Sequence, residues 1–124
     1  MTSKPILVAG PDHPITANPD HVVVRLKGTT IAETDGSLTL QEGPYPPVSY
    51  IPRADVDMTL LVRSPHTTYC PYKGDASYYS IPLGGEQSIN AIWSYETPHA
   101  SVSQIKDYMA FYPDRVDSIE ARDD

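Results

Sequence analysis

Apolar and β-branched residues occur along this chain in short runs that glycine, proline or aspartate interrupts every few residues. Runs at residues 22–27 and 30–34 flank Gly28-Thr29, and this spacing predicts a β-hairpin with a two-residue turn. After a second turn signal at Asp35-Gly36, residues 37–40 alternate polar and apolar side chains, as a half-buried strand does. The first third of the chain is therefore expected to form antiparallel strands.

Three further strands are predicted in the middle of the chain. Residues 57–63 suit either a helix or a strand by periodicity, and their short length and their neighbours favour a strand. Residues 76–83 and 88–96 are rich in tyrosine, isoleucine, tryptophan and serine, and Gly84-Gly85 supplies a turn between them. These segments extend the antiparallel pattern.

One segment has a convincing helical period. After Pro98, Ser101 is placed to cap a short helix in which Val102 and Ile105 fall on one face. Residues 109–112 are expected to return to strand. The predicted fold class is therefore mainly β, built as a compact antiparallel or barrel-like sheet with one short C-terminal helix.

Proline is unusually frequent, with 13 in 124 residues, and each proline fixes φ and removes a backbone donor. Four prolines within residues 1–20 predict an extended arm laid over the domain. The prolines within residues 43–47 predict an extended, polyproline II segment. A chain of this length buries one core, so we expect an arm at 1–20, a single β domain at 21–120 and an acidic tail at 121–124.

The charge pattern narrows the classes of partner. The net charge is −7 and the nine basic residues are scattered singly, whereas a nucleic-acid surface needs clustered positive charge. The N-terminal apolar run is too short for a signal peptide, and no window reaches the ~18 apolar residues that cross a bilayer. We therefore expect a cytoplasmic protein with no nucleic-acid or membrane partner, and the sequence leaves its oligomeric state open.

The most distinctive chemistry lies in residues 68–74. Pro71 and Gly74 predict a turn after Cys70 that brings the Lys73 ammonium back toward the sulfur. A nearby cation favours the thiolate, so Cys70 and Lys73 are the catalytic candidates, with Cys70 as nucleophile or redox centre. The alternative is an inert thiol, because free cysteine usually packs as a small hydrophobic residue. Enzyme activity therefore stays undecided at this stage.

Aromatic residues point to a binding pocket. Nine tyrosines stand against one phenylalanine, and a hydroxylated ring suits a place where its edge meets water or a polar partner. With Trp93 these rings could wall a pocket, or they could be half-buried sheet residues. Arg53 offers a planar fork to a carboxylate or phosphate, or it pairs with nearby Asp55. The predicted ligand-binding residues are Tyr50, Arg53, Asp55, Tyr72, Tyr78, Trp93 and Tyr95.

Metal and phosphate sites are not predicted. Structural zinc needs four cysteine or histidine ligands in close pairs, but Cys70 is the single cysteine and the histidines are dispersed. His66 and Cys70 are the nearest approach to a ligand pair. The sequence also lacks the glycine-rich loops that cradle phosphates. We therefore predict no metal and no cofactor.

These observations favour one function over two alternatives. The chain is predicted to bind a small ligand in a pocket of tyrosine and tryptophan near the turn at 70–74, with Arg53 or Lys73 available to hold an anionic group. The first alternative is an enzyme that uses Cys70. The second is a protein-interaction module, which the proline-rich segment 43–47 and the acidic tail permit.

Four blocks of the sequence carry a family resemblance. They are Tyr-Ile-Pro-Arg-Ala-Asp-Val at 50–56, Thr-Tyr-Cys-Pro-Tyr-Lys-Gly-Asp-Ala-Ser-Tyr-Tyr-Ser at 68–80, Ala-Ile-Trp-Ser-Tyr at 91–95 and Ala-Phe-Tyr-Pro-Asp-Arg-Val at 110–116. In this order they resemble the signature of domain-of-unknown-function family 427, which is sometimes labelled nucleotidyltransferase-like. The resemblance covers about Val22 to Val116.

The resemblance implies a β-tent-like fold, similar to methionine sulfoxide reductase B and the thalidomide-binding domain of cereblon. Those proteins often carry zinc on paired Cys-x-x-Cys motifs. This chain has no such motif, so the resemblance implies a zinc-free version. It does not assign a function, because one fold hosts both enzymes and binding domains.

Overall fold

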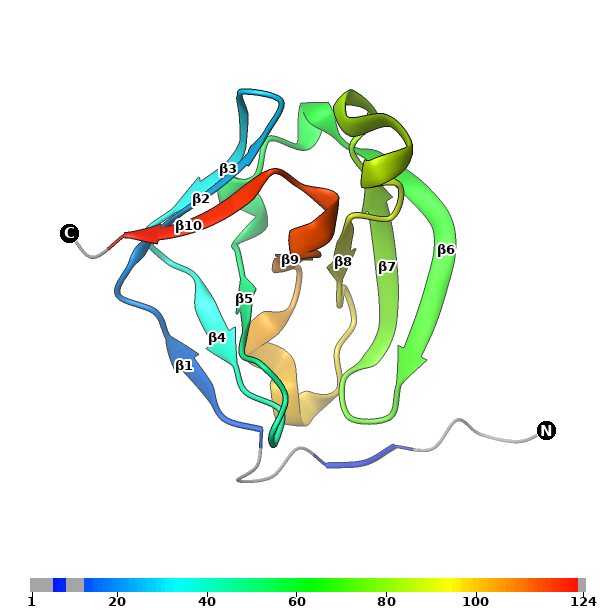
Figure 1. Cartoon of the computed structure of the whole chain (residues 1–124). Coiled ribbons are helices and arrows are strands. Elements are labelled where there is room, and N and C mark those ends of the chain that lie inside the picture. Colours follow the sequence, from blue (N-terminus) through cyan, green and yellow to red (C-terminus); the bar gives the residue numbers. More distant parts are fainter. Residues whose placement is uncertain (1–5, 9–12, 123–124) are drawn as a thin grey trace.

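The computed structural model describes residues 6–8 and 13–122 of the chain. These residues form three antiparallel sheets (Figure 1). The first sheet has the order β1 (Ile15–Ala17), β4 (Leu38–Leu40), β5 (Val48–Tyr50). The second has the order β10 (Ser118–Arg122), β2 (His21–Leu26), β3 (Thr29–Thr34). The third has the order β6 (Val62–Cys70), β7 (Gly74–Ser80), β8 (Ile92–Ser94), β9 (Met109–Phe111).

The prediction of a mainly β, antiparallel fold is confirmed. None of the three sheets closes into a barrel within the described residues. Short 3₁₀ turns connect the strands, at Arg53–Asp55, Met58–Leu60, Pro82–Ser88, Ala100–Ile105 and Pro113–Arg115. In the same part of the chain no helix is long and apolar enough to cross a membrane.

Two apolar clusters hold the sheets together. Side chains along β7 and β8 point alternately to the two faces of their sheet, so that neighbouring residues belong to different clusters. Tyr79 and Ile92, which are paired across β7 and β8, belong to a cluster that includes Val22, Val24 and Leu26 of β2. Tyr78 belongs to the other cluster, against which its partner Trp93 packs, together with Tyr50 of β5. Successive side chains of a strand point to opposite faces, so the strands β7, β8 and β9 have apolar packing on both faces, whereas β6 at the edge is mostly exposed.

The hairpin of β2 and β3 is present with its turn one residue earlier than predicted. Lys27 and Gly28 both have positive φ, at 51° and 75°, which is the backbone of a type I′ turn. Thr29 already belongs to β3. The Asp117 carboxylate accepts the Lys27 N–H at 2.7 Å, and this bond stabilises a conformation that a residue with a side chain rarely adopts.

The predicted strand at 57–63 is wrong for its first half. The Asp57 carboxylate accepts the Thr59 N–H at 3.1 Å and begins a 3₁₀ turn over Met58–Leu60. Strand β6 starts only at Val62. A short polar side chain that bonds nearby backbone favours a turn over extended structure. The strand was predicted from the apolar pattern of this segment, which does not show this effect of Asp57.

The predicted C-terminal helix is a kinked 3₁₀ segment over Ala100–Ile105. Val102 and Ile105 are buried as expected, but the N-cap residue is His99, and Ser101 lies inside the segment. Asp107 then takes a positive φ of 63°. A segment this short gains too few hydrogen bonds to offset helix nucleation, so packing alone sets its shape.

Three other segments differ from their predicted form. Residues 43–47 contain a turn, because Gly43 has a φ of 52° and the Tyr45 N–H bonds the Glu42 carbonyl at 3.0 Å. The strands predicted at 76–83 and 88–96 shorten to β7 and β8, since Pro82–Ser88 forms 3₁₀ turns.

The ends of the chain also contribute strands. Residues 15–17 of the predicted arm are extended and pair with β4, and β10 continues to Arg122 in the predicted tail. Residues 1–5 and 9–12 of the predicted arm and residues 123–124 of the predicted tail lie outside the described residues. The proposed boundaries at residues 20 and 120 stay predictions.

Candidate functional site

The turn predicted after Cys70 is present and joins β6 to β7. Cys70 and Gly74 are paired across the two strands, and the Lys73 N–H donates to the Cys70 carbonyl at 3.2 Å. Gly74 has a φ of 108°, and a Cβ there would lie 3.3 Å from the Thr97 carbonyl oxygen. Glycine is favoured at this position, because the positive φ would strain a residue with a side chain and the carbonyl oxygen would have to move slightly to admit a Cβ.

The Lys73 ammonium is committed to a carboxylate. Its side chain is only 8% exposed and forms an ion pair with Glu42. It also lies 5.6 Å from the centre of the Tyr95 ring. Cys70 is half-buried against the apolar cluster that contains Tyr95. Because the contacts of the ammonium are Glu42 and Tyr95, the activation of the Cys70 thiol by Lys73 stays a prediction.

Four of the predicted ligand-binding residues gather in one cluster, namely Tyr50, Tyr78, Trp93 and Tyr95. The Trp93 indole N–H donates to the Tyr50 hydroxyl at 3.3 Å, with the two rings edge to face. Burial raises the pKa of Tyr50 and of Tyr95 well above the usual value for tyrosine. Both phenols therefore stay neutral at physiological pH and serve as packing and hydrogen-bonding groups.

Tyr112, which the sequence did not single out as a binding residue, joins this cluster from the end of β9. The centroid of its ring lies 4.5 Å from that of Trp93, and the Arg115 guanidinium carbon also lies 4.5 Å from the centroid of the Tyr112 ring. Burial and a hydrogen bond with Tyr78 raise the pKa of Tyr112 to about 12. The Tyr78 hydroxyl also bonds that of Thr68 at 2.9 Å. Trp93 is thus held between two rings.

The other three predicted ligand-binding residues lie elsewhere. Asp55 accepts a hydrogen bond from the Thr34 hydroxyl at 2.6 Å. Tyr72 packs against the His13 ring with centroids 4.5 Å apart. Arg53 binds Glu96 rather than facing the tyrosines. The pocket predicted from all seven residues is therefore not assembled as such.

Glu96 is the centre of a polar network that the sequence did not reveal. Arg53 donates to its carboxylate at 2.9 Å, and Arg63 donates to both of its oxygens at 2.8 and 3.0 Å. The hydroxyls of Ser77 and Tyr79 each donate to it at 3.0 Å. Hydrogen bonds from Arg63, then from the other three groups, outweigh burial and lower the pKa of Glu96 to about 2. We call these five residues the Glu96 network.

The two arginines of the Glu96 network are already bound to an anion. Each guanidinium contacts the Glu96 carboxylate and the Tyr79 hydroxyl. An anionic ligand would have to displace a carboxylate that is held by four hydrogen-bonding partners, and Lys73 is likewise paired with Glu42. Arg53 and Lys73, which were predicted to bind an anionic ligand, are therefore already paired with carboxylates of the same protein.

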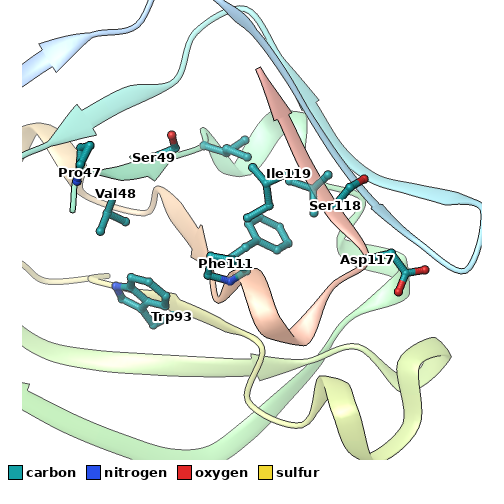
Figure 2. A pocket seen from close by; sticks show the side chains of 11 residues that line it. Pro47, Val48, Ser49, Trp93, Phe111, Asp117, Ser118 and Ile119 are labelled. Atoms are coloured by element: carbon teal, nitrogen blue, oxygen red, sulfur yellow. The ribbon is translucent and has the colours of Figure 1, made fainter. Parts of the chain in front are cut away.

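A separate groove of about 510 Å³ opens between β5, β9 and β10 (Figure 2). We call it the Trp93 groove, and its lining residues are Val24, Pro47, Val48, Ser49, Ile51, Trp93, Phe111, Pro113, Asp117, Ser118 and Ile119. Figure 2 shows Val48 and Trp93 on one side of it and Phe111 beside Ile119 on the other. Its volume is in the range of small-molecule sites, roughly 300–1,000 Å³.

The lining of the Trp93 groove is mainly apolar with a few polar groups. Ser49, Ser118 and Asp117 supply hydroxyls and one carboxylate, and Asp117 is the single ionisable side chain among the lining residues. A low-dielectric wall with a carboxylate disfavours a second negative charge. The groove therefore suits an uncharged or cationic ligand with a large apolar surface.

Of the residues that line the groove, Trp93 alone was predicted to bind a ligand. Phe111 lies in the apolar run at 109–112, which the sequence marks as a strand. Val48 and Ile119 follow a proline-rich turn and a 3₁₀ turn, and they look like ordinary strand residues. No local signal separates a groove residue from a core residue here, because the site forms where strands of three sheets meet. In the described part of the chain, no three His, Cys, Asp or Glu side chains cluster to hold a metal.

Comparison with known proteins identifies the family. No match to a curated protein was found. The model of a family described as a domain of unknown function, DUF427, matches residues 14–122. The matched region contains all ten strands and the four signature blocks. The chain therefore belongs to the DUF427 family.

Proposed function

We propose that this domain is a ligand-binding module, that its site is the Trp93 groove and that its ligand is small and mainly apolar. The observation that carries this proposal is an open cavity of about 510 Å³ walled by Trp93, Phe111 and Ile119. Large apolar side chains left around an unfilled space are typical of binding sites.

The energetics of the groove support binding. Each 100 Å² of apolar ligand surface that leaves water contributes roughly 2.5 kcal/mol. The indole that would contact the ligand is fixed by its hydrogen bond to Tyr50 and by packing on Tyr112. A wall that is already ordered loses little entropy when a ligand arrives, so a modest contact area is sufficient for measurable affinity.

The expected charge of the ligand follows from the ion pairs that the cationic side chains already form. Arg53 and Lys73 are paired with Glu96 and Glu42, and the groove presents Asp117. The proposed ligand is therefore neutral or cationic, in contrast to the anionic ligand that the sequence suggested.

A thermal-shift screen tests the proposal, with neutral, cationic and anionic metabolites at matched concentration. A ligand that binds the native state raises the melting temperature as its concentration exceeds its Kd. Stabilisation is expected from neutral or cationic apolar compounds, and Trp93→Ala is expected to abolish it. Tyr72→Ala is the matched control, since it removes an aromatic ring outside the groove.

Two results would contradict the proposal. One is that no compound stabilises the protein. The other is that Trp93→Ala and the unchanged protein are stabilised equally. Because Trp93 is the single tryptophan, its fluorescence reports directly on occupation of the groove and confirms any hit from the screen.

A further inference from the structure

The sheets protect most of their edge strands. Strand β6 carries Pro65 and an irregular register with β7. Strand β1 is three residues long and lies between Pro14 and Pro19. The outer side of β3 is covered by a bridge between Ala32 and Val56. Proline, irregular pairing, short length and coverage are the usual devices that stop an edge strand from pairing with another chain.

The edge at β10 is different. Within the described residues β10 pairs with β2 alone, over five residues in continuous register and without proline. Its two charged side chains, Glu120 and Arg122, bind each other at 3.0 Å. An edge strand of this kind presents backbone N–H and C=O groups that can accept another strand.

The Trp93 groove runs along this open edge. The consecutive residues Asp117, Ser118 and Ile119 all line it, as Figure 2 shows. Side chains alternate between the two faces of a strand. When neighbours in sequence line one groove, that groove borders the edge of the strand and reaches its backbone as well as one face.

The opposite side of the groove also offers backbone groups. The consecutive residues Pro47, Val48 and Ser49 line it at β5. The N–H and C=O of Ile51 bond Met109 of β9, away from β4. Because these directions alternate along a strand, the N–H and C=O of Ser49 also point away from β4. The groove therefore combines apolar walls with main-chain hydrogen-bonding groups on both sides.

We infer that the ligand of the Trp93 groove is an extended, apolar segment of a partner protein that adds to β10 as a further strand. Alternate side chains of the segment enter the groove and contact Trp93 and Phe111. The carboxylate of Asp117 and the net charge of −7 favour a neutral or basic segment over an acidic one. This inference rests on the proposed function, and it names the class of ligand.

A pair of N-methylated peptides tests the inference. The probe is an acetylated and amidated hexapeptide, Lys-Val-Lys-Leu-Lys-Val, followed through Trp93 fluorescence at physiological salt. Two isomeric controls carry N-methyl groups on the valines and leucine or on the lysines. Strand addition uses the N–H groups of every second residue. One isomer is therefore expected to bind about tenfold more weakly than the probe, and the other to bind about as well as the probe.

The variants and the remaining outcomes separate this inference from the proposed function. In calorimetric titration, which needs no tryptophan signal, Trp93→Ala is expected to lose the peptide, while Tyr72→Ala keeps it. Equal binding of both isomers overturns strand addition. Binding of apolar small molecules but of no peptide overturns the inference and leaves the proposed function standing. If neither class binds, both fail. A concentration-dependent dimer in sedimentation equilibrium that the peptide does not dissociate assigns the edge to a second copy and overturns the inference.

Discussion

The Glu96 network and the Trp93 groove lie close together in the fold, but the polar groups of the network are paired within the protein, whereas the apolar side chains of the groove border an open space. Tyr79 of the network pairs with Ile92, the residue before Trp93. In the network each guanidinium meets a carboxylate and a hydroxyl of the same chain. In the groove, large apolar side chains surround an open space.

This difference teaches that polarity alone is a poor guide to a binding site. Arg53 looks like a ligand-binding residue in the sequence because it is a fork-shaped cation, yet its hydrogen bonds to Tyr79 and Glu96 hold three segments of the protein together. Trp93 has fewer polar contacts and more room beside it. A group that is satisfied within the protein stabilises the fold, and a group with an open side is available to a ligand.

Acid is expected to break the network first and with the largest effect. Hydrogen bonds from Arg63 and the other network groups lower the pKa of Glu96 from the ordinary value of 4.5 to about 2 in the folded protein. The contribution of Glu96 is therefore fully present above pH 4.5 and is lost as pH falls toward 2, by about 2 kcal/mol in total once solvent screening of the exposed Arg63 partner is allowed for. Urea unfolding at a series of pH values measures this loss.

The matched variants for this prediction are Glu96→Gln and Glu86→Gln, which remove a bound and an exposed carboxylate. Glu96→Gln is expected to be less stable at pH 7 and to lose much less stability between pH 4.5 and 2. Glu86→Gln is expected to follow the unchanged protein. If the two variants share one pH profile, Glu96 is not the group that binds the proton.

Trp93→Ala, unlike the protonation of Glu96, is expected to change ligand binding strongly and protein stability less. The side chain is only partly buried, so its removal should cost about 2 kcal/mol, less than a fully buried tryptophan. Binding of groove ligands should weaken by about tenfold or more. Calorimetry and ligand titration on the same sample measure the losses of stability and of affinity. A variant that is strongly destabilised but binds groove ligands as tightly as the unchanged protein would contradict the comparison.

Tyr50→Phe sharpens the comparison inside the groove. The change removes the acceptor of the Trp93 indole N–H, which lies 3.3 Å from it. One buried hydrogen bond is worth about 1 kcal/mol, and the freed indole should show a shifted fluorescence maximum. Tyr45→Phe is the control, because Tyr45 is exposed. An unchanged spectrum would mean that this hydrogen bond does not fix the indole.

Arg63→Ala should have the smallest effect of the series. The Arg63 side chain is 56% exposed, and an exposed ion pair contributes about 0.5 kcal/mol. Arg53 is less exposed, so Arg53→Ala should cost more. Equal losses in urea unfolding would show that exposure does not determine how much each arginine contributes to the Glu96 network.

Local features of the sequence predicted local features of the structure. The hairpin of β2 and β3, the turn after Cys70 and the burial of Val102 follow from turn residues and periodicity. The Glu96 network could not be predicted in this way, because its members lie up to 43 positions apart. The groove was equally hidden, since it depends on how the edges of β5 and β10 approach each other.

The pairing of β10 with β2 has a consequence for how the chain reaches its native state. The bond between Lys27 and Asp117 spans 90 positions, and β2 carries the fully apolar run Val22, Val23 and Val24. Until residues 118–122 arrive, one side of this valine strand has no neighbour, and such a strand is prone to aggregate. Chains cut short before residue 118 should therefore precipitate or recruit chaperones, although they retain every residue of the Glu96 network.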